Sequence, residues 1–143
     1  MITAAVIRER PGMRMPEREV RRIAALVCRR ERVRTASFSI VLTGDRTIAR
    51  LHRKHFGDPT VTDVITFPLD AGRNEAEIYI DVDQARRQAA RYGVTLRGEL
   101  TRLIVHGMLH TLGYDDRTPA KRTAMFAVQE RYVRDLAPAP RKG

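Results

Sequence analysis

The apolar stretch Leu96–Leu112 limits the possible folds more than any other part of the chain. Leu100 and Ile104 belong to a helical repeat of apolar residues, Thr95 is placed to cap the start of the helix, and Gly113 is placed to end it. A helix with so many apolar residues must bury them against another layer of secondary structure. We therefore expect this helix to pack on a sheet formed by other parts of the chain.

The rest of the pattern supplies such a sheet, because strands come early in the chain and helices cluster late. The strands expected are Ile2–Ile7, Ser37–Thr43, Asp63–Phe67, which Pro68 would stop, and Ile78–Ile80, which can pair with the third as a hairpin. One further helix is expected after Pro16, a second after a cap at Gly44-Asp45, and a third around Ala85–Tyr92 that ends at Gly93. The last is expected from Thr118, with an inner stripe of Met125, Phe126, Gln129, Tyr132, Val133 and Leu136. This order predicts an α+β fold, with several helices packed on a small mixed sheet.

Length and cysteine content place this fold in a broad class of protein. The 143 residues suit one domain, predicted over 1–137, with a flexible tail over 138–143. The single cysteine, Cys28, excludes an internal disulfide and favours a reducing compartment; it fits a buried packing role better than a reactive thiol. No stretch approaches the roughly 18 apolar residues of a membrane span. We expect a cytoplasmic protein with no membrane partner.

The basic composition of the chain has two interpretations. The formal net charge is +10, and of the 27 basic residues three are lysine and 24 are arginine. Arginine binds phosphate through two parallel hydrogen bonds and stacks on bases, which favours a nucleic-acid partner. Arginine-rich codon usage with a merely solvated basic surface explains the same composition equally well. Composition alone leaves both interpretations open.

The chemistry of the chain is concentrated in the pattern His-x-x-x-His-x-x-Gly-x-x-Asp. His106 and His110 lie four residues apart on the expected helix, so both imidazoles project from one face. Gly113 then allows the chain to reverse, and Asp116 can return a carboxylate to the same point. This is the spacing of a zincin-like metal helix with its glycine turn, with Asp116 in place of a third histidine. Two ordinary helix histidines near a chain reversal are the alternative.

The expected metal ligands and the residue after the first histidine limit the reactions that the site could catalyse. Two histidines and one carboxylate leave a coordination position open for water, as in catalytic zinc sites. We therefore assign His106, His110 and Asp116 both as metal ligands and as the catalytic residues that act through the metal-bound water. Zinc peptidases place a glutamate base directly after the first histidine, where this chain has Gly107. A phosphodiester substrate is therefore favoured over a peptide.

The stretch His106–Asp116 resembles the His-Gly-x-Leu-His-x-x-Gly-Tyr-Asp-His signature of the YbeY family, the metal-dependent endoribonucleases of ribosomal RNA maturation. The stretch Thr62–Pro68 is similar to the Thr-Asp-Val-Leu-Ser-Phe-Pro segment of this family, and Ile78–Ile80 resembles its next strand. The resemblance runs in order from about Ser39 to Leu136. It departs from the family at three places, with Asp116 for the third metal-binding histidine, Phe56 for a frequent arginine, and Ala76-Glu77 for Gly-Asp.

The resemblance implies a specific function. The chain would be a single-strand-specific, zinc-dependent endoribonuclease that matures the 3′ end of small-subunit rRNA and serves ribosome quality control. Its partners would be single-stranded RNA, including rRNA, and the ribosome or its small subunit. One Zn²⁺ per chain is expected, and Asp116 leaves another divalent metal open. Arg53 and Lys54 stand near the position of the missing arginine and are RNA-binding candidates, with a merely solvated helix face as the alternative.

Two further residues have alternative roles, and two other functions remain open. Asp115 can orient a ligand histidine or bond its own backbone in a turn. Thr62, with Asp63, can contact RNA along the cleft or cap an edge strand. A metal-stabilised, ribosome-associated RNA-binding factor with little nuclease activity would fit Phe56 and Asp116, and a metal-dependent hydrolase of another substrate is the third candidate.

Overall fold

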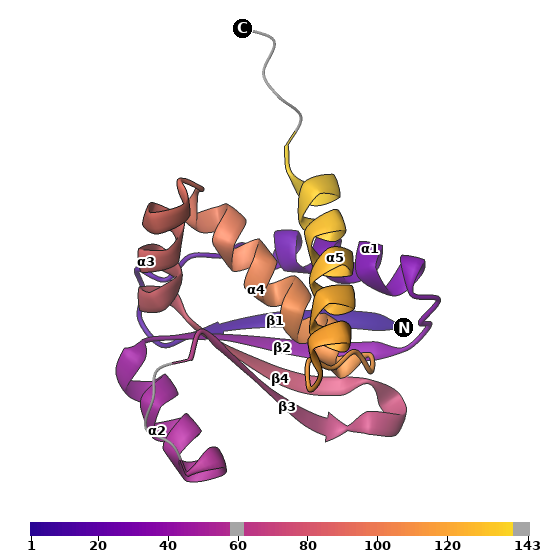
Figure 1. The fold of residues 1–143 in the computed structure, drawn as a ribbon, viewed down its shortest axis with the longest axis horizontal. Coiled ribbons are helices and arrows are strands. Elements are labelled where there is room, and N and C mark those ends of the chain that lie inside the picture. Colours follow the sequence, from indigo (N-terminus) through magenta and orange to yellow (C-terminus); the bar gives the residue numbers. More distant parts are fainter. Residues whose placement is uncertain (58–61, 139–143) are drawn as a thin grey trace, which may run out of the picture.

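The computed structural model describes residues 1–57 and 62–138, and these residues form the expected α+β fold (Figure 1). The strands are β1 (Ile2–Arg8), β2 (Ala36–Thr43), β3 (Val64–Asp70) and β4 (Glu75–Asp81). The helices are α1 (Glu17–Arg30), α2 (Asp45–Phe56), α3 (Val82–Tyr92), α4 (Leu96–Thr111) and α5 (Pro119–Leu136), with a short 3₁₀ turn at Ala71–Arg73. The prediction of a small mixed sheet with several helices packed on it is confirmed.

The sheet is mixed because its strands run in both directions. The strand order is β1-β2-β4-β3, with β1, β2 and β4 parallel and β3 antiparallel to β4. The expected pairing of the last two strands is therefore confirmed. Alternate residues of β2 and β4, such as Phe38, Ile40 and Ile78, are fully buried in the main core, which the helices α1, α3, α4 and α5 complete.

Pro68 does not end the third strand as expected. β3 continues to Asp70, with Pro68 paired to Ala76 and an irregular register between Pro68 and Asp70. Proline cannot donate a hydrogen bond to a neighbouring strand, and β3 lies at the edge of the sheet, where one side of the strand needs no donor. The sequence could not show that this strand was an edge strand.

Helix α2 lies on a different face of the sheet from the other four helices. Figure 1 shows it below the sheet, whereas α1, α3, α4 and α5 lie above it. Its one fully buried side chain, Ile48, is not part of the main core. His55 packs its ring on Phe67 of β3, at 4.6 Å between ring centroids, and Phe67 meets Tyr79 edge-on. α2 therefore covers the opposite face of the sheet.

Helix α4 crosses the sheet very closely at Gly107. A Cβ atom at this position would lie 2.5 Å from Cγ2 of the fully buried Ile78 on β4. The residue after His106 thus faces the sheet, where a side chain of any size would collide with the core. This explains why the position of the peptidase glutamate is occupied by glycine, and it sets the depth at which α4 carries its histidines.

Three expectations about exposure have different outcomes. The placement of Phe126 on the inner stripe of the last helix is wrong, because its side chain is 59% exposed. Cys28 is 1% exposed, and burial raises the pKa of its thiol to about 11, which fits a packing role. Among the described residues, no helix is long and apolar enough to cross a membrane. Of the tail predicted over 138–143, residues 139–143 lie outside the described residues.

Candidate metal centre

The two motif histidines face each other near the end of α4. Their Nε2 atoms are 3.1 Å apart, and both rings are partly buried. One donor atom from each of His106, His110 and Asp116 lies within 4.8 Å of the other two. Donors that share one ion at about 2.0–2.2 Å lie at most about 4.4 Å apart. The separation of 3.1 Å between the two Nε2 atoms and that of 3.7 Å from His110 Nε2 to Asp116 Oδ2 fall within this limit. The structure therefore brings together the three residues expected from the sequence to hold a metal.

Hydrogen bonds on the far side of each ring leave both Nε2 atoms free to bind a cation. Nδ1 of His106 lies 2.8 Å from Oε1 of Gln129, and Nδ1 of His110 lies 3.1 Å from the carbonyl oxygen of Tyr114. Both partners are acceptors, so each Nδ1 carries the proton and each Nε2 presents its lone pair. Two lone pairs that point at one another repel, and a bound cation would relieve that repulsion.

The turn that supplies the Tyr114 carbonyl is fixed from a distant part of the chain. Gly113 has a φ of 109°, a conformation that favours glycine, and lets the chain reverse after α4. The hydroxyl of Tyr114 donates to Glu31 at 2.7 Å, and the hydroxyl of Tyr132 on α5 donates to the other oxygen of Glu31 at 2.5 Å. Glu31 thus joins the end of α1, the turn after α4, and α5. Local sequence patterns did not indicate this role.

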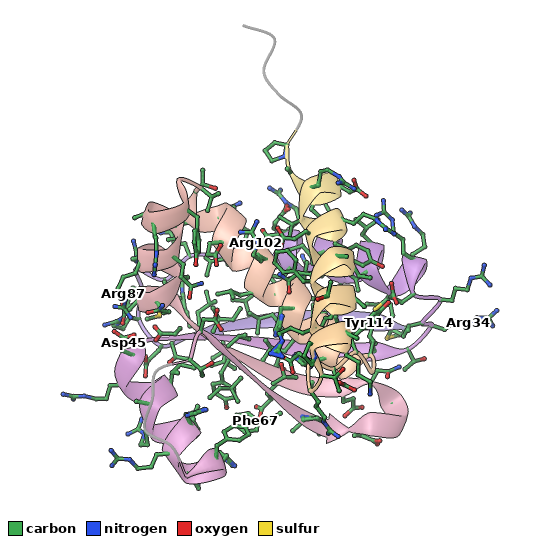
Figure 2. All side chains as sticks on the ribbon, viewed as in Figure 1. Arg34, Asp45, Phe67, Arg87, Arg102 and Tyr114 are labelled. Carbon is green, nitrogen blue, oxygen red and sulfur yellow. The ribbon has the colours of Figure 1, made fainter. Side chains whose placement is uncertain are left out.

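A chain of hydrogen bonds fixes Gln129 in turn. The amide of Gln129 donates to Glu130 at 3.0 Å, and Glu130 accepts two hydrogen bonds from the guanidinium of Arg102. Arg102 also pairs with Glu99, a carboxylate that is only 2% exposed. Figure 2 shows Arg102 on α4 and Tyr114 in the turn that follows it. The orientation of His106 is therefore set by contacts among α4 and α5.

The two aspartates after α4 have different surroundings. Oδ2 of Asp116 lies 3.7 Å from Nε2 of His110, on the side where the two rings meet. Asp115 instead accepts a hydrogen bond from the backbone N–H of Arg117 at 3.1 Å and pairs with Lys121 at 3.3 Å. The first of these bonds holds the pKa of Asp115 below its usual range. Of the two roles expected for Asp115, its contacts are those of the turn residue, and the partners of the ring Nδ1 atoms are Gln129 and Tyr114.

The electrostatics of the site favour neutral histidine. Burial lowers the pKa of His110, and the neighbouring His106 lowers it further, whereas the Asp116 carboxylate acts in the opposite direction. Neutral imidazole is the form that binds a metal. The residues present therefore fit a zinc-type ion in donor chemistry, protonation and spacing.

His106 lines two small cavities. One, of about 180 Å³, is lined by His106, Asp116, Arg122 and Phe126, among others. The exposed Phe126 therefore borders the same cavity as two of the proposed metal ligands. The other cavity, of about 220 Å³, is lined by His106 and Asp63 among others, so the start of β3 also borders the site. The sequence pattern had missed Arg122 and Phe126.

The three RNA-binding candidates lie farther out on the molecule. Arg53 and Lys54 are exposed in the last turn of α2, and Thr62 is half-buried just before β3. Within the described part of the chain, none of the three lines either cavity beside His106. Phe56, which stands where the family often has arginine, is 60% exposed at the end of α2. An RNA-binding surface that includes Arg53 and Lys54 would therefore extend from the candidate metal centre to α2.

Comparison with known proteins decides the family. The family model described as Endoribonuclease YbeY matches residues 10–137, which include every residue of the candidate metal centre. The chain belongs to the YbeY family. The resemblance inferred from the stretch His106–Asp116 is thereby confirmed.

Several YbeY relatives resemble this chain over most of its length. The endoribonuclease YbeY of Chlorobium phaeovibrioides is 34% identical over 85% of this chain and 83% of its own. The YbeY of Chloroherpeton thalassium is 33% identical over 85% and 87%, and that of Acholeplasma laidlawii is 38% identical over 66% and 70%. The solution structure of TM1509 from Thermotoga maritima has the same fold, with a TM-score of 0.65, 24% identity, and coverage of 95% of this chain and 89% of that one.

Proposed function

We propose that this protein is a zinc-dependent endoribonuclease that cleaves single-stranded RNA, with ribosomal RNA as its natural substrate and the 3′ end of small-subunit rRNA as its target. The proposal includes a role in ribosome quality control, contact with the small ribosomal subunit, and a cytoplasmic setting. It treats residues 1–137 as one catalytic domain. Membership of the YbeY family supports the RNA substrate.

One observation carries the proposal. The Nε2 atoms of His106 and His110 converge to 3.1 Å beside the Asp116 carboxylate, while acceptors hold both Nδ1 protons on the far side. These three side chains would hold a zinc ion, which would supply Lewis acidity toward a phosphoryl oxygen and a water molecule. Gln129 and the Tyr114 carbonyl orient the rings for this purpose.

The residues around the centre suit a single strand of RNA. Phe126 presents an exposed ring on which a base can stack, and Arg122 supplies a guanidinium for a phosphate, both beside His106 and Asp116. Arg53 and Lys54 extend positive charge along α2. These contacts read the backbone and the flat faces of bases, so we expect cleavage with little sequence preference.

Cleavage and metal content test this proposal together. Purified protein should cleave a single-stranded RNA and contain about one zinc per chain, and His110→Ala should lose both properties. His55→Ala, which removes a histidine outside the cluster, should keep the zinc. Full metal occupancy after Asp116→Ala would show that this carboxylate is not a required ligand.

The same experiment separates the two alternatives. RNA binding without any cleavage by the zinc-loaded protein would favour the ribosome-associated binding factor, for which Phe56 is the supporting residue. Turnover of a peptide or small molecule without RNA cleavage would favour a hydrolase of another class, against which the close approach of Gly107 to Ile78 argues.

A further inference from the structure

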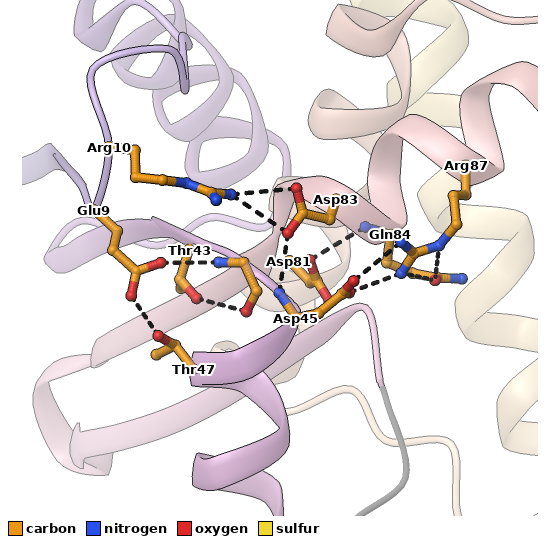
Figure 3. Close-up of polar contacts among 10 residues, drawn as sticks. Glu9, Arg10, Thr43, Asp45, Thr47, Asp81, Asp83, Gln84 and Arg87 are labelled. Carbon is orange, nitrogen blue, oxygen red and sulfur yellow. Dashed lines mark hydrogen bonds and ion pairs between the residues drawn. The ribbon is translucent and has the colours of Figure 1, made fainter.

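A second group of carboxylates lies at the other end of the sheet from the turn between β3 and β4. β2 ends at Thr43 and the parallel strand β4 ends at Asp81, and these two residues are paired in the sheet. Asp45 begins α2 directly after β2, and Asp83 lies in the first turn of α3 directly after β4. Figure 3 shows the three aspartates together with their partners. One carboxylate oxygen from each lies within 4.8 Å of the other two.

The topology of the sheet makes this edge a place where ligands commonly bind. After β2 the chain enters α2 on one face of the sheet, and after β4 it enters α3 on the other face. Strands whose connections leave to opposite faces create a crevice outside their carboxyl ends, and open sheets of this kind bind ligands there. The aspartates lie at that switch point, between β2 and β4.

The central aspartate has a buried oxygen without a hydrogen-bond donor. Asp81 is fully buried, and its Oδ1 accepts the backbone N–H of Gln84 at 3.1 Å to cap α3. Among the described residues, Oδ2 of Asp81 is the one buried side-chain oxygen or nitrogen that no donor reaches. The neighbouring group that interacts with the Asp81 carboxyl is that of Asp45, itself an acceptor. A buried carboxylate oxygen aimed at other carboxylates needs a cation or a proton between them.

Two flanking arginines pair with the outer two carboxylates of this cluster. Arg87 binds both oxygens of Asp45, at 2.7 and 3.0 Å, and Arg10 approaches Asp83 at 3.2 Å. Three carboxylates thus face two guanidinium groups that lie to either side of Asp81 (Figure 3). Oδ2 of Asp83 also accepts the backbone N–H of Asp45 at 3.1 Å, so both of its lone pairs are in use. Oδ1 of Asp83 and both oxygens of Asp45 each accept from one arginine and keep a second lone pair for coordination.

Solvent has access to the cluster from the outside. A hollow of about 450 Å³ is lined by Asp45 and Asp83 together with Arg10, Gly44 and other residues of the same edge, including Arg46 and Arg50. A Cβ atom at position 44 would lie 2.7 Å from Oδ2 of Asp83, so the glycine leaves that carboxylate in place. A small hydrated ion can therefore reach Asp45 and Asp83 without any opening of the core.

We propose that Asp45, Asp81 and Asp83 form a second metal site, distinct from the His106 centre, that binds a hard divalent cation such as Mg²⁺ or Mn²⁺. All three donors are carboxylate oxygens, which suit these ions rather than zinc, and one oxygen from each lies within 4.8 Å of the other two. The bound ion joins the start of α2 to the start of α3. The ion therefore holds α2, the helix that carries Arg53 and Lys54, against the sheet.

Binding of Mn²⁺ tests the site directly. His106→Ala/His110→Ala protein, which lacks the first centre, should bind about one Mn²⁺ per chain by electron paramagnetic resonance, with a dissociation constant on the order of 0.1–1 mM. Asp81→Asn in that background, which keeps an N-cap side chain, should weaken binding at least about tenfold, and Asp45→Asn should do the same. Asp70→Asn, which removes an exposed carboxyl from β3, is the matched control and should leave binding unchanged.

Hydrogen exchange provides a readout in the otherwise unaltered protein. Mg²⁺ at about 5 mM should slow exchange of the first amides of α2 several-fold in wild type and leave it unchanged in Asp81→Asn. No saturable Mn²⁺ binding up to about 10 mM, or equal binding by Asp81→Asn, would overturn the proposal and leave the cluster as carboxyl groups that share a proton. RNA cleavage and zinc content test the His106 centre separately, so failure of one proposal leaves the other standing.

Discussion

The geometry of the proposed metal centre depends on individual side chains outside the set of proposed ligands. Gln129 accepts the Nδ1 proton of His106 and is itself fixed by Glu130. Partners of this kind set which nitrogen of an imidazole is free and where it points, and their loss commonly costs about 10- to 100-fold in metal affinity. The position of Gln129 on a helix 23 residues away is therefore as relevant to the site as the motif itself.

Substitution of Gln129 tests this dependence. Gln129→Ala should lower zinc affinity by about 10- to 100-fold, measured by competition with a chromophoric chelator, because the His106 ring loses its acceptor. Gln129→Glu retains an acceptor oxygen and should restore most of the affinity. Gln84→Ala, which removes a glutamine that does not contact the rings, is the control. An unchanged affinity in Gln129→Ala would mean that packing alone holds His106.

Asp81 makes stability depend on pH in a predictable direction. Burial and then the neighbouring Asp45 carboxyl raise the pKa of Asp81 to about 7, although the amide of Gln84 acts in the opposite direction. Other charged groups at this edge are Asp83, Glu9, Arg10, Arg46, Arg50 and Arg87. Because an aspartate in the unfolded chain titrates near pH 3.9, the native state holds a proton between about pH 4 and 7 that the unfolded state lacks. The resulting stabilisation is complete below about pH 4 and is lost as pH rises through about 7.

Urea unfolding measures this effect. In EDTA, the free energy of unfolding of wild type should fall between about pH 5 and 7 relative to that of Asp81→Asn, by on the order of 1 kcal/mol per pH unit. The asparagine side chain of this variant carries no titratable proton and still caps α3, so the variant should lack this component. Asp70→Asn should follow wild type. Parallel pH profiles for wild type and Asp81→Asn would contradict the assignment.

At the scale of elements, the placement of α4 decides both the core and the chemistry. The helix is apolar around much of its surface because the sheet lies on one side and α1, α3 and α5 contact its other sides. Gly107 permits the closest approach, against Ile78. The same approach excludes a catalytic side chain at this position, so the helix cannot supply the base that a zinc peptidase uses there.

Filling the gap at Gly107 should therefore destabilise the fold. Gly107→Ala places a methyl group 2.5 Å from a buried Ile78 atom and should lower the free energy of unfolding by about 1–3 kcal/mol, despite the better helix propensity of alanine. Chemical denaturation measures the difference. Gly12→Ala is the control, because a Cβ there meets nothing within 4 Å. Wild-type stability in Gly107→Ala would show that Ile78 can move aside.

For the molecule as a whole, composition alone does not show whether the net charge of +10 serves to bind RNA. Some of the arginines, such as Arg22, Arg30 and Arg102, are paired with carboxylates and stabilise the fold. Arg53 and Lys54 on α2 are exposed. Membership of the YbeY family now favours the RNA interpretation of the excess charge over codon usage alone.

The salt dependence of RNA binding distinguishes the two interpretations. If about three phosphates are neutralised, affinity for a single strand should fall about 20-fold between roughly 50 and 200 mM salt. Replacing Arg53 and Lys54 by glutamine should reduce the slope of log affinity against log salt by about 1.4. Arg34→Gln, at the far end of the molecule from α2 (Figure 2), should not change it. A flat salt response would rule out phosphate binding by the basic surface.

The family, the fold class and the three converging side chains of the metal centre could all be predicted from the order of the residues. His106, His110 and Asp116 span eleven residues, and helix geometry with a glycine turn is enough to predict that they lie close together. The strands and helices followed from local periodicity in the same way. Two predictions were wrong. Pro68 does not end β3, because β3 is an edge strand, and Phe126 does not face the core, because it lies on an exposed side of α5.

The contacts between distant groups became visible only in the folded molecule. Glu31 reaches Tyr114 across 83 residues, Gln129 reaches His106 across 23, and the paired ends of β2 and β4 bring Asp45 to Asp81 and Asp83. No local period predicts such contacts, because they depend on which strands pair and which faces the helices cover. The partners that orient the histidines and the second carboxylate cluster are therefore properties of the packed molecule.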